Sequence, residues 1–277
     1  QFQPSVTSLG DNEFVVVWSS YAWKINQRHL KYDDSSNTII ELGPQNNNDH
    51  QVSQSTSSCH YPDIVTLKDG KYVVTWHGSS VGGTGHSSND IGVTIFDPKV
   101  DYYSKVEPNV ATKNGTYEFR ANSYTSNQQY HPSITALEDG GFAIAWFGYG
   151  PNYDSNDIWV RLFNADGSAR GEEFRANTYT TNTQEHPSIE SLENGEFVVA
   201  WQSANQPNDS NGTGIFAQEF NSDGSKKGNE FQVNTTYTYS NQRYPHVERV
   251  GTNDYMITWD SSNQDNSGYA AYGKVYF

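Results

Sequence analysis

The chain has 277 residues, with 32 acidic against 17 basic side chains and a formal net charge of −15. Such a surface repels phosphate groups, so nucleic acids and anionic membranes are poor partners. The sequence has no run of 18 apolar residues that could span a membrane, and its single cysteine, Cys59, excludes an intrachain disulfide.

A 15-residue frame that begins with proline and ends with tryptophan occurs five times along the chain. The proline and the tryptophan are 14 residues apart in every copy, and successive copies start 58, 70, 55 and 58 residues apart. This regularity predicts a repeat protein. The five frames run from Pro4 to Trp18, Pro62 to Trp76, Pro132 to Trp146, Pro187 to Trp201 and Pro245 to Trp259.

Each frame predicts two antiparallel strands joined by a tight turn. Asp69-Gly70, Asp139-Gly140 and Asn194-Gly195 mark the turn, because glycine and asparagine tolerate the positive φ of tight hairpins. The second strand is apolar on both faces, as in Phe197-Val-Val-Ala-Trp201, so neighbouring sheets should cover both of its faces.

Two further strands are predicted after each tryptophan, for example over 215–220 and 230–234. Four antiparallel strands in five repeats predict an all-β fold, a single five-bladed β-propeller over 1–277, with an open β-solenoid as the alternative. The last blade lacks a fourth strand, which leaves an edge that a segment in cis or in trans could pair. The predicted blades are about 1–58, 59–128, 129–183, 184–241 and 242–277.

The connections between second and third strands and between blades are long and polar, and such loops on a rigid scaffold often bind ligands. Their aromatic residues are candidate glycan contacts, namely Trp23, Tyr149, Tyr153 and Tyr179. Aspartates among Asn, Ser and Gly could bind Ca²⁺ there, although asparagine and aspartate are also ordinary turn formers. The candidate calcium ligands are Asp90, Asp154, Asp157, Asp209 and Asp265. Sequons for N-glycosylation occur at Asn114, Asn208, Asn211 and Asn234.

The residue before each repeat proline is Gln3, Tyr61, His131, His186 or Tyr244. If the first strand is innermost, these side chains surround the mouth of the central channel. A histidine pair there could bind a transition metal, but the spacing favours packing instead.

Three carboxylates lie on predicted first strands: Asp63, Glu190 and Glu248. Glu190 and Glu248 both stand three residues after their proline and should lie at a similar depth. Five-bladed glycosidases place catalytic carboxylates on innermost strands, and hydrolysis needs an acid together with a base or nucleophile. Near-equivalent repeats favour repeated binding instead.

The pattern Gln-x-x-Pro-Ser-Ile…Asp-Gly-Gly-Phe…Trp, followed by Phe-Asn-x-Asp-Gly-Ser and Glu-Phe-x-Val-Asn-Thr, carries a resemblance. It resembles repeats of very large secreted bacterial calcium-binding or adhesin-type proteins, and repeats of protist surface proteins. The match is close for repeats three and four, reaches the third strand of repeat five, and covers only the Pro-to-Trp frame of repeats one and two. The resemblance implies an extracellular propeller module and supplies no catalytic residues.

The sequence therefore predicts a non-catalytic structural or adhesive module at the cell surface or outside the cell, one that binds glycans or builds a filament or surface layer. Its partners would be glycans, copies of itself or neighbouring domains, and no cofactor is required beyond the candidate Ca²⁺. The alternative is a five-bladed glycosidase that uses Asp63, Glu190 and Glu248.

Overall fold

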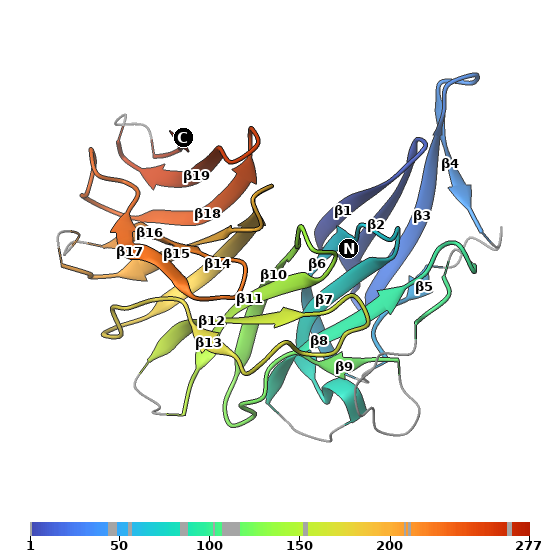
Figure 1. The fold of residues 1–277 in the computed structure, drawn as a ribbon, viewed down its shortest axis with the longest axis horizontal. Coiled ribbons are helices and arrows are strands. Elements are labelled where there is room, and N and C mark those ends of the chain that lie inside the picture. The colour runs from blue at the N-terminus through green and yellow to red at the C-terminus, as the bar shows by residue number, and fades with distance from the viewer. Residues whose placement is uncertain are drawn as a thin grey trace. The chain divides into compact units, whose positions relative to one another are not determined.

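The protein is an all-β, five-bladed β-propeller, as the sequence predicts (Figure 1). The computed structural model describes residues 2–43, 49–54, 57–83, 88–101, 103–106, 117–151, 155–207, 209, 212–264 and 268–277. Within these ranges the only helical element is a short 3₁₀ turn, η1 (Val81–Gly83), and no helix could cross a membrane.

Each blade is an antiparallel sheet whose strands follow the order of the chain. Blades one and two contain β1 (Phe2–Gly10), β2 (Glu13–Ser19), β3 (Ile25–Asp33), β4 (Thr38–Leu42), β5 (His50–Gln51), β6 (Ser57–Thr66), β7 (Tyr72–Ser79), β8 (Asn89–Phe96) and β9 (Phe119–Arg120). Blades three and four contain β10 (Gln129–Ala136), β11 (Phe142–Tyr149), β12 (Asn156–Phe163), β13 (Phe174–Arg175), β14 (Gln184–Ser191), β15 (Phe197–Ala204), β16 (Thr213–Phe220) and β17 (Lys226–Gln232). Blade five contains β18 (Gln242–Arg249), β19 (Tyr255–Ser262) and β20 (Tyr269–Tyr276).

The chain divides into two compact units, which are described separately below. Unit one comprises Gln1–Pro132, Gly140–Phe142 and Phe163–Arg170, and so contains blades one and two. Unit two comprises Ser133–Asp139, Ala143–Leu162 and Gly171–Phe277, and so contains blades four and five with most of blade three.

The first strands of blades one, two, four and five carry a β-bulge at the repeat proline. On β14, Glu185 pairs with Gln202 and Ser188 with Ala200, so two residues, His186 and Pro187, lie opposite one. The residue before the proline has a positive φ in all five blades, at Gln3 (52°), Tyr61 (49°), His131 (47°), His186 (53°) and Tyr244 (53°). A bulge redirects the side chain that it carries. Five equivalent side chains are therefore turned out of the regular strand alternation.

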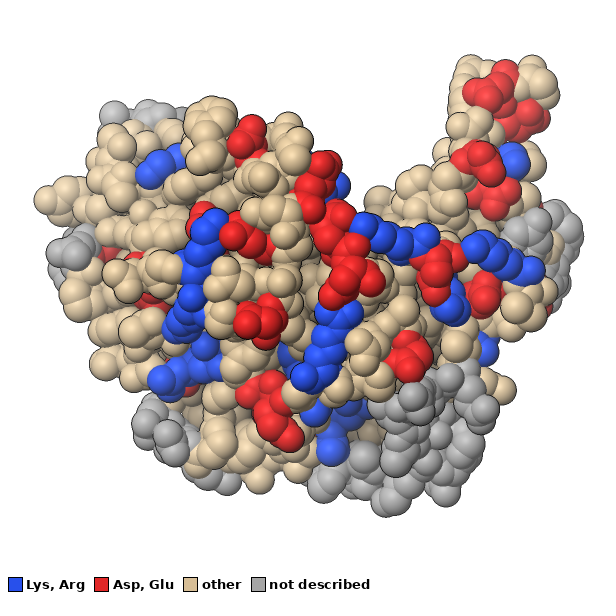
Figure 2. All heavy atoms as spheres, viewed as in Figure 1, with Lys and Arg blue, Asp and Glu red and all other residues tan. Residues whose placement is uncertain are grey.

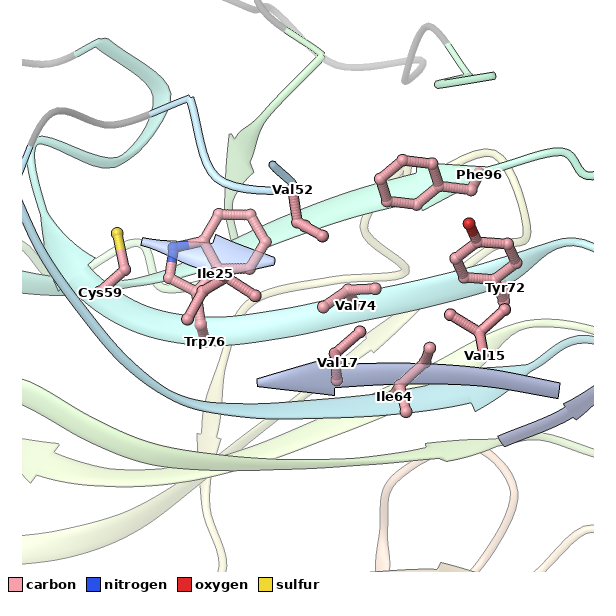
Figure 3. Packing of buried hydrophobic residues seen from close by; sticks show 10 residues of the cluster. All are labelled: Val15, Val17, Ile25, Val52, Cys59, Ile64, Tyr72, Val74, Trp76 and Phe96. Atoms are coloured by element: carbon pink, nitrogen blue, oxygen red, sulfur yellow. The ribbon is translucent and has the colours of Figure 1, made fainter. Parts of the chain in front are cut away.

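The core lies between neighbouring blades. In unit one, Tyr72 and Trp76 of β7 face Val15 and Val17 of β2, and the ring of Tyr72 stacks on Phe96 with centroids 4.9 Å apart (Figure 3). Blades four and five of unit two repeat this arrangement, with Tyr255 and Trp259 packed against blade four. Burial of each tryptophan removes about 150–250 Å² from water, the largest apolar contribution of a repeat.

A buried asparagine closes blades two, three and four. In blade three, Asn177 accepts a hydrogen bond from the backbone N–H of Ile158 (2.8 Å) and donates to the carboxylate of Asp157 (2.6 Å). It donates also to the carbonyl oxygen of Tyr179 (2.9 Å). Asn122 with Asp90 in blade two and Asn234 with Asp209 in blade four make the same contacts. We call this arrangement the asparagine clamp.

The variant Asn177→Ala tests the clamp. It leaves the Asp157 carboxylate and the Ile158 N–H buried without the asparagine, so we expect a loss of about 2–4 kcal/mol in the free energy of unfolding. Urea titration of both proteins measures this loss. Asn221→Ala, at a half-buried turn residue whose amide donates to the Ser225 hydroxyl, is the matched control and should change stability by no more than about 0.5 kcal/mol. Equal effects of the two variants would contradict a special role for the clamp.

Candidate functional site

Serine and threonine hydroxyls join the first strands of neighbouring blades. In unit two, Ser188 Oγ accepts a hydrogen bond from the backbone N–H of Val247 (3.0 Å), and Thr135 Oγ1 accepts one from Ser191 (3.1 Å). In unit one, Ser5 Oγ donates to Asp63 Oδ1 (2.8 Å). The innermost strands of each unit therefore form a polar layer that is held at fixed register.

A cluster of aromatic and imidazole rings lies at the bulged end of these strands in unit one. Tyr61 stacks on His131 with centroids 3.6 Å apart, and both rings lie near His77, at 5.5 and 5.6 Å. His60 continues the series between His77 (5.6 Å) and Trp23 (4.8 Å). We call these five residues the ring cluster. Tyr61 and Trp23 are 39% and 51% exposed, so the cluster presents ring surface to solvent.

His77 is the buried centre of the ring cluster. Its Nδ1 accepts a hydrogen bond from the backbone N–H of His131 (3.3 Å), which requires an unprotonated nitrogen. Burial lowers the pKa of His77 well below its ordinary value, and nearby His131 and His60 act in the same direction. Burial also lowers the pKa of His60. The imidazoles of His77 and His60 are therefore neutral at physiological pH.

Unit two has a smaller version of this arrangement. His186 lies edge-on to Tyr244, with ring centroids 4.8 Å apart, and 5.8 Å from Phe147. Burial, with a contribution from the charge of Arg243, lowers the pKa of His186 to about 4. The backbone N–H of Tyr244 donates to Gln202 Oε1 (3.4 Å), as that of His131 does to His77. The residue after the repeat tryptophan thus supports the bulge of the next blade.

The three candidate carboxylates lie on innermost strands, but their surroundings differ. Asp63 on β6 is half-buried and accepts hydrogen bonds from Ser5 Oγ and from the backbone N–H of Ile64 (2.9 Å). Glu190 on β14 is half-buried and accepts from Thr135 Oγ1 (3.4 Å). Glu248 on β18 is exposed, and its Oε2 lies 3.4 Å from Nε2 of His246.

Glu190 and Glu248 occupy equivalent positions on neighbouring strands of unit two. Glu190 pairs with Val198, and Glu248 pairs with Met256, each three residues before the repeat tryptophan. This agrees with their equal spacing from the repeat proline. Blades one and three carry Thr7 and Thr135 at this position, so the five innermost strands are not chemically equivalent.

The structure places the three described calcium candidates, Asp90, Asp157 and Asp209, in the asparagine clamps. Arg175 Nη1 also lies 3.4 Å from Asp157, and Gln232 Nε2 donates to Asp209 (2.9 Å). In the part of the chain that the structure describes, no three His, Cys, Asp or Glu side chains are grouped as metal ligands. Asp154 and Asp265 lie outside the described residues. Calcium binding stays a prediction.

The remaining candidates are divided between the surface and the interior. Trp23 belongs to the ring cluster, Tyr149 ends β11, and the Tyr179 hydroxyl donates to the carbonyl oxygen of Asn205 (3.2 Å). Asn234 is buried, and its amide nitrogen donates to Asp209, Tyr237 and Gln242, so a glycan attached there would disrupt a clamp. Tyr153 and the other three sequons, at Asn114, Asn208 and Asn211, lie outside the described residues.

His77 is the site residue that the sequence analysis missed. It directly follows a repeat tryptophan, where the other copies have Ser19, Phe147, Gln202 and Asp260. An alignment of the five repeats with one another would have shown that the position after the invariant tryptophan varies. Its partner is the bulge of the next blade, a contact over 54 residues that spacing within one repeat does not reveal.

No family model matches the sequence, and no curated protein matches it. Solved structures share its fold. An α-L-arabinofuranosidase from Fusarium graminearum superposes with a TM-score of 0.61 at 14% identity, over 97% of this chain and 79% of that chain. An endo-arabinase from Bacteroides thetaiotaomicron gives 0.53 at 12% identity, over 99% and 93%. A thermostable family-43 glycoside hydrolase gives 0.54 at 10% identity, over 99% and 89%.

These comparisons correct the main functional interpretation of the sequence. The prediction of a non-catalytic structural or adhesive module is wrong, because the three solved propellers named above are an arabinofuranosidase, an endo-arabinase and a family-43 glycoside hydrolase. The fold agrees better with the glycosidase alternative. The resemblance to adhesin-type repeats, and the extracellular location that it implies, stay predictions.

The buried histidines give a prediction for stability against pH. Because the pKa of His77 is lower in the folded chain than its ordinary 6.5, the unfolded chain takes up the proton first on acidification. The contribution of His77 to the free energy of unfolding is therefore fully present above about pH 6.5 and is lost as the pH decreases below this value. We expect a lower Tm at pH 5 than at pH 7.5, and a smaller decrease in His77→Gln, which keeps an acceptor for the His131 N–H.

Calorimetry at both pH values measures the effect. A His77→Gln variant with the full wild-type decrease would exclude His77 as a source of acid sensitivity.

Proposed function

We propose that the protein is a glycoside hydrolase that acts on a polysaccharide, with carboxylates of the innermost strands as its acid and base groups. The supporting observation is the combination of groups on these strands. Each of the three carboxylates follows a bulged ring residue within four positions: Tyr61 and Asp63, His186 and Glu190, Tyr244 and Glu248. Rings that could bind the apolar face of a sugar thus lie on the same strands as carboxylates that can transfer protons.

Hydrolysis requires two carboxyl groups with different roles. One, in its acid form, donates a proton to the leaving glycosidic oxygen, while the other, as carboxylate, either activates a water molecule or attacks the anomeric carbon. Glu190 and Glu248 are the pair that we assign to these roles, since they stand in register on neighbouring strands of one unit. Asp63, which accepts a hydrogen bond from Ser5, belongs to unit one and is not assigned to this pair.

The chemistry of the surface agrees with a neutral or weakly charged polymer as substrate. On the face drawn in Figure 2, acidic and basic side chains are interspersed rather than gathered into a single basic area. The exposed rings of the cluster, together with the net charge of −15, suit an uncharged glycan better than an acidic one. By analogy with the endo-arabinase among the solved propellers, arabinan is the polymer to try first.

The proposed roles of the two glutamates predict a loss of turnover when either is replaced. Glu190→Gln and Glu248→Gln should each decrease hydrolysis by at least about 100-fold, because removal of a general acid or base costs this much. Release of reducing sugar from arabinan, arabinoxylan and xylan measures the loss. Glu172→Gln, an exposed carboxylate away from the innermost strands, is the matched control and should keep full activity.

An activated aryl glycoside separates the two roles. Its leaving group needs no proton, so the variant that lacks the general acid should regain activity on it, while the other should not. Absence of turnover on every glycoside tried, in a chain shown to be folded, would refute the proposal; so would full activity of both variants.

A second prediction concerns the rings. Tyr244→Ala removes an exposed ring of unit two that lies edge-on to His186, and we expect KM for the polysaccharide to increase about tenfold, with a much smaller change in kcat. Tyr21→Ala, a highly exposed tyrosine outside the ring cluster, serves as the control. A decrease confined to kcat would contradict a binding role for Tyr244.

A further inference from the structure

Three polar residues of unit two occupy the same position on neighbouring first strands. Thr135 on β10, Glu190 on β14 and Glu248 on β18 each stand three residues after the repeat proline. Hydrogen bonds between these strands repeat one pattern, in which the N–H of Ile189 and that of Val247 each bind the serine hydroxyl that follows the preceding proline, at 3.4 and 3.0 Å. The step from β10 to β14 therefore matches the step from β14 to β18.

The hydroxyl proton of Thr135 is directed at Glu190. Oγ1 of Thr135 accepts a hydrogen bond from the backbone N–H of Ser191 (3.1 Å) and donates one to Glu190 Oε2 (3.4 Å). A hydroxyl has a single proton to donate, and the Ser191 N–H already occupies one of its lone pairs. Among the described residues no other acceptor meets this hydroxyl. Thr135 is 3% exposed, so water competes little for the proton.

This contact gives the two glutamates of unit two unlike surroundings. A donor directed at a carboxyl group favours its ionised form, because the hydrogen bond is stronger when the acceptor is charged. Glu190 is half-buried, and the Thr135 hydroxyl replaces part of the water that burial removes. Glu248 is exposed, and the corresponding residue on the strand before it is Glu190 rather than a hydroxyl. Thr135 therefore distinguishes two carboxyl groups that stand in register.

We propose that Thr135 is a positioning residue that holds Glu190 in its ionised form, so that Glu190 is the base or nucleophile and Glu248 the general acid. These roles depend on the proposed function. As the glycosidic C–O bond breaks, Glu248 transfers its proton to the departing oxygen, while Glu190 either takes the proton of the attacking water or bonds to the anomeric carbon. Glu248 then regains a proton from solvent, to which its side chain is 62% exposed.

Unit one contains the same threonine without a carboxylate. Thr7 also stands three residues after its proline, and its Oγ1 lies 3.0 Å from Oγ1 of Thr66 on the first strand of blade two. The residue of blade two that corresponds to Glu190 is Val65. Thr7 therefore joins two blades as Thr135 does, but it supports no charge. Thr7→Val is the matched control for a threonine that only joins blades.

The ionisation of Glu190 is measurable without turnover. In protein labelled with carbon-13 at the glutamate carboxyl groups, the NMR signal that is missing in Glu190→Gln belongs to Glu190, and its change with pH gives the midpoint of titration. Thr135→Val should raise this midpoint by at least about half a pH unit, because the ionised form loses a donor. Thr135→Ser, which keeps a hydroxyl, should have the wild-type midpoint, and so should Thr7→Val.

The pH profile of hydrolysis gives a second readout. A base or nucleophile must be ionised, so the acidic limb of the kcat/KM profile should move to higher pH in Thr135→Val by the same amount as the NMR midpoint. Thr135→Ser should restore the wild-type limb. On an activated aryl glycoside, whose leaving group needs no proton, Glu248→Gln should regain activity and Glu190→Gln should not.

The wild type alone decides the matter if Thr135→Val does not fold. Its Thr135 Cβ signal should follow the titration of Glu190, and should lose this change in Glu190→Gln. An unchanged Glu190 midpoint in folded Thr135→Val, or a Thr135 signal that does not follow the titration, overturns the proposal. So does an aryl glycoside that rescues Glu190→Gln instead of Glu248→Gln. Absence of all hydrolysis refutes the proposed function and the two roles with it, whereas the titration decides in either case whether Thr135 stabilises the charge on Glu190.

Discussion

The buried asparagine at the end of the fourth strand is the contact on which each closed blade depends. A fourth strand of two to seven residues makes few ladder hydrogen bonds, as Phe174–Arg175 and Lys226–Gln232 show. One side chain compensates, because Asn177 bonds to the backbone of the third strand, to the carboxylate of Asp157 on the same strand and to its own following turn. The low polarity around such a clamp strengthens its bonds and makes an unpaired member costly. A short strand can therefore close a blade.

The backbone of the first strands is nearly the same in all blades at the repeat proline, while their side chains vary. The residue before each proline has nearly the same positive φ in all five blades, although it is Gln, Tyr or His. The backbone is thus specified by the repeat, while the side chains differ between blades. In this way a scaffold of near-identical blades can hold an asymmetric group of rings and carboxylates, as a catalytic site requires.

Much of the fold could be predicted from the sequence, because its signals are local. The Pro-to-Trp frame, the Asp-Gly turns and the two-residue alternation define the hairpins, and the structure confirms them at Gly70, Gly140 and Gly195. The clamp was not predicted, since Asp157 and Asn177 stand 20 residues apart in a chain rich in both residue types. The same aspartates instead suggested calcium.

The ring cluster was predicted only in part. Residues before proline prefer extended backbone, so the positive φ that redirects Tyr61 and His131 had no sequence signal. The contact of His77 with the next blade needs the blade packing itself, which spacing within one repeat does not contain. For Glu190 and Glu248, by contrast, equal distance from the proline was sufficient to place them in register.

A glutamate at the start of the fourth strand accepts a hydrogen bond from the end of the preceding blade, and this affects how the chain folds during synthesis. Glu118 binds the end of blade one, and Glu230 binds the end of blade three, so a blade gains its last hydrogen bonds only when the following blade has been made. A ribosome releases the N-terminal part first, which leaves each new blade incomplete for the time needed to translate about one more repeat. Folding coupled in this way between nearest neighbours proceeds in the direction of translation. Slow codons near the ends of the repeats would then help folding more than slow codons within the hairpins.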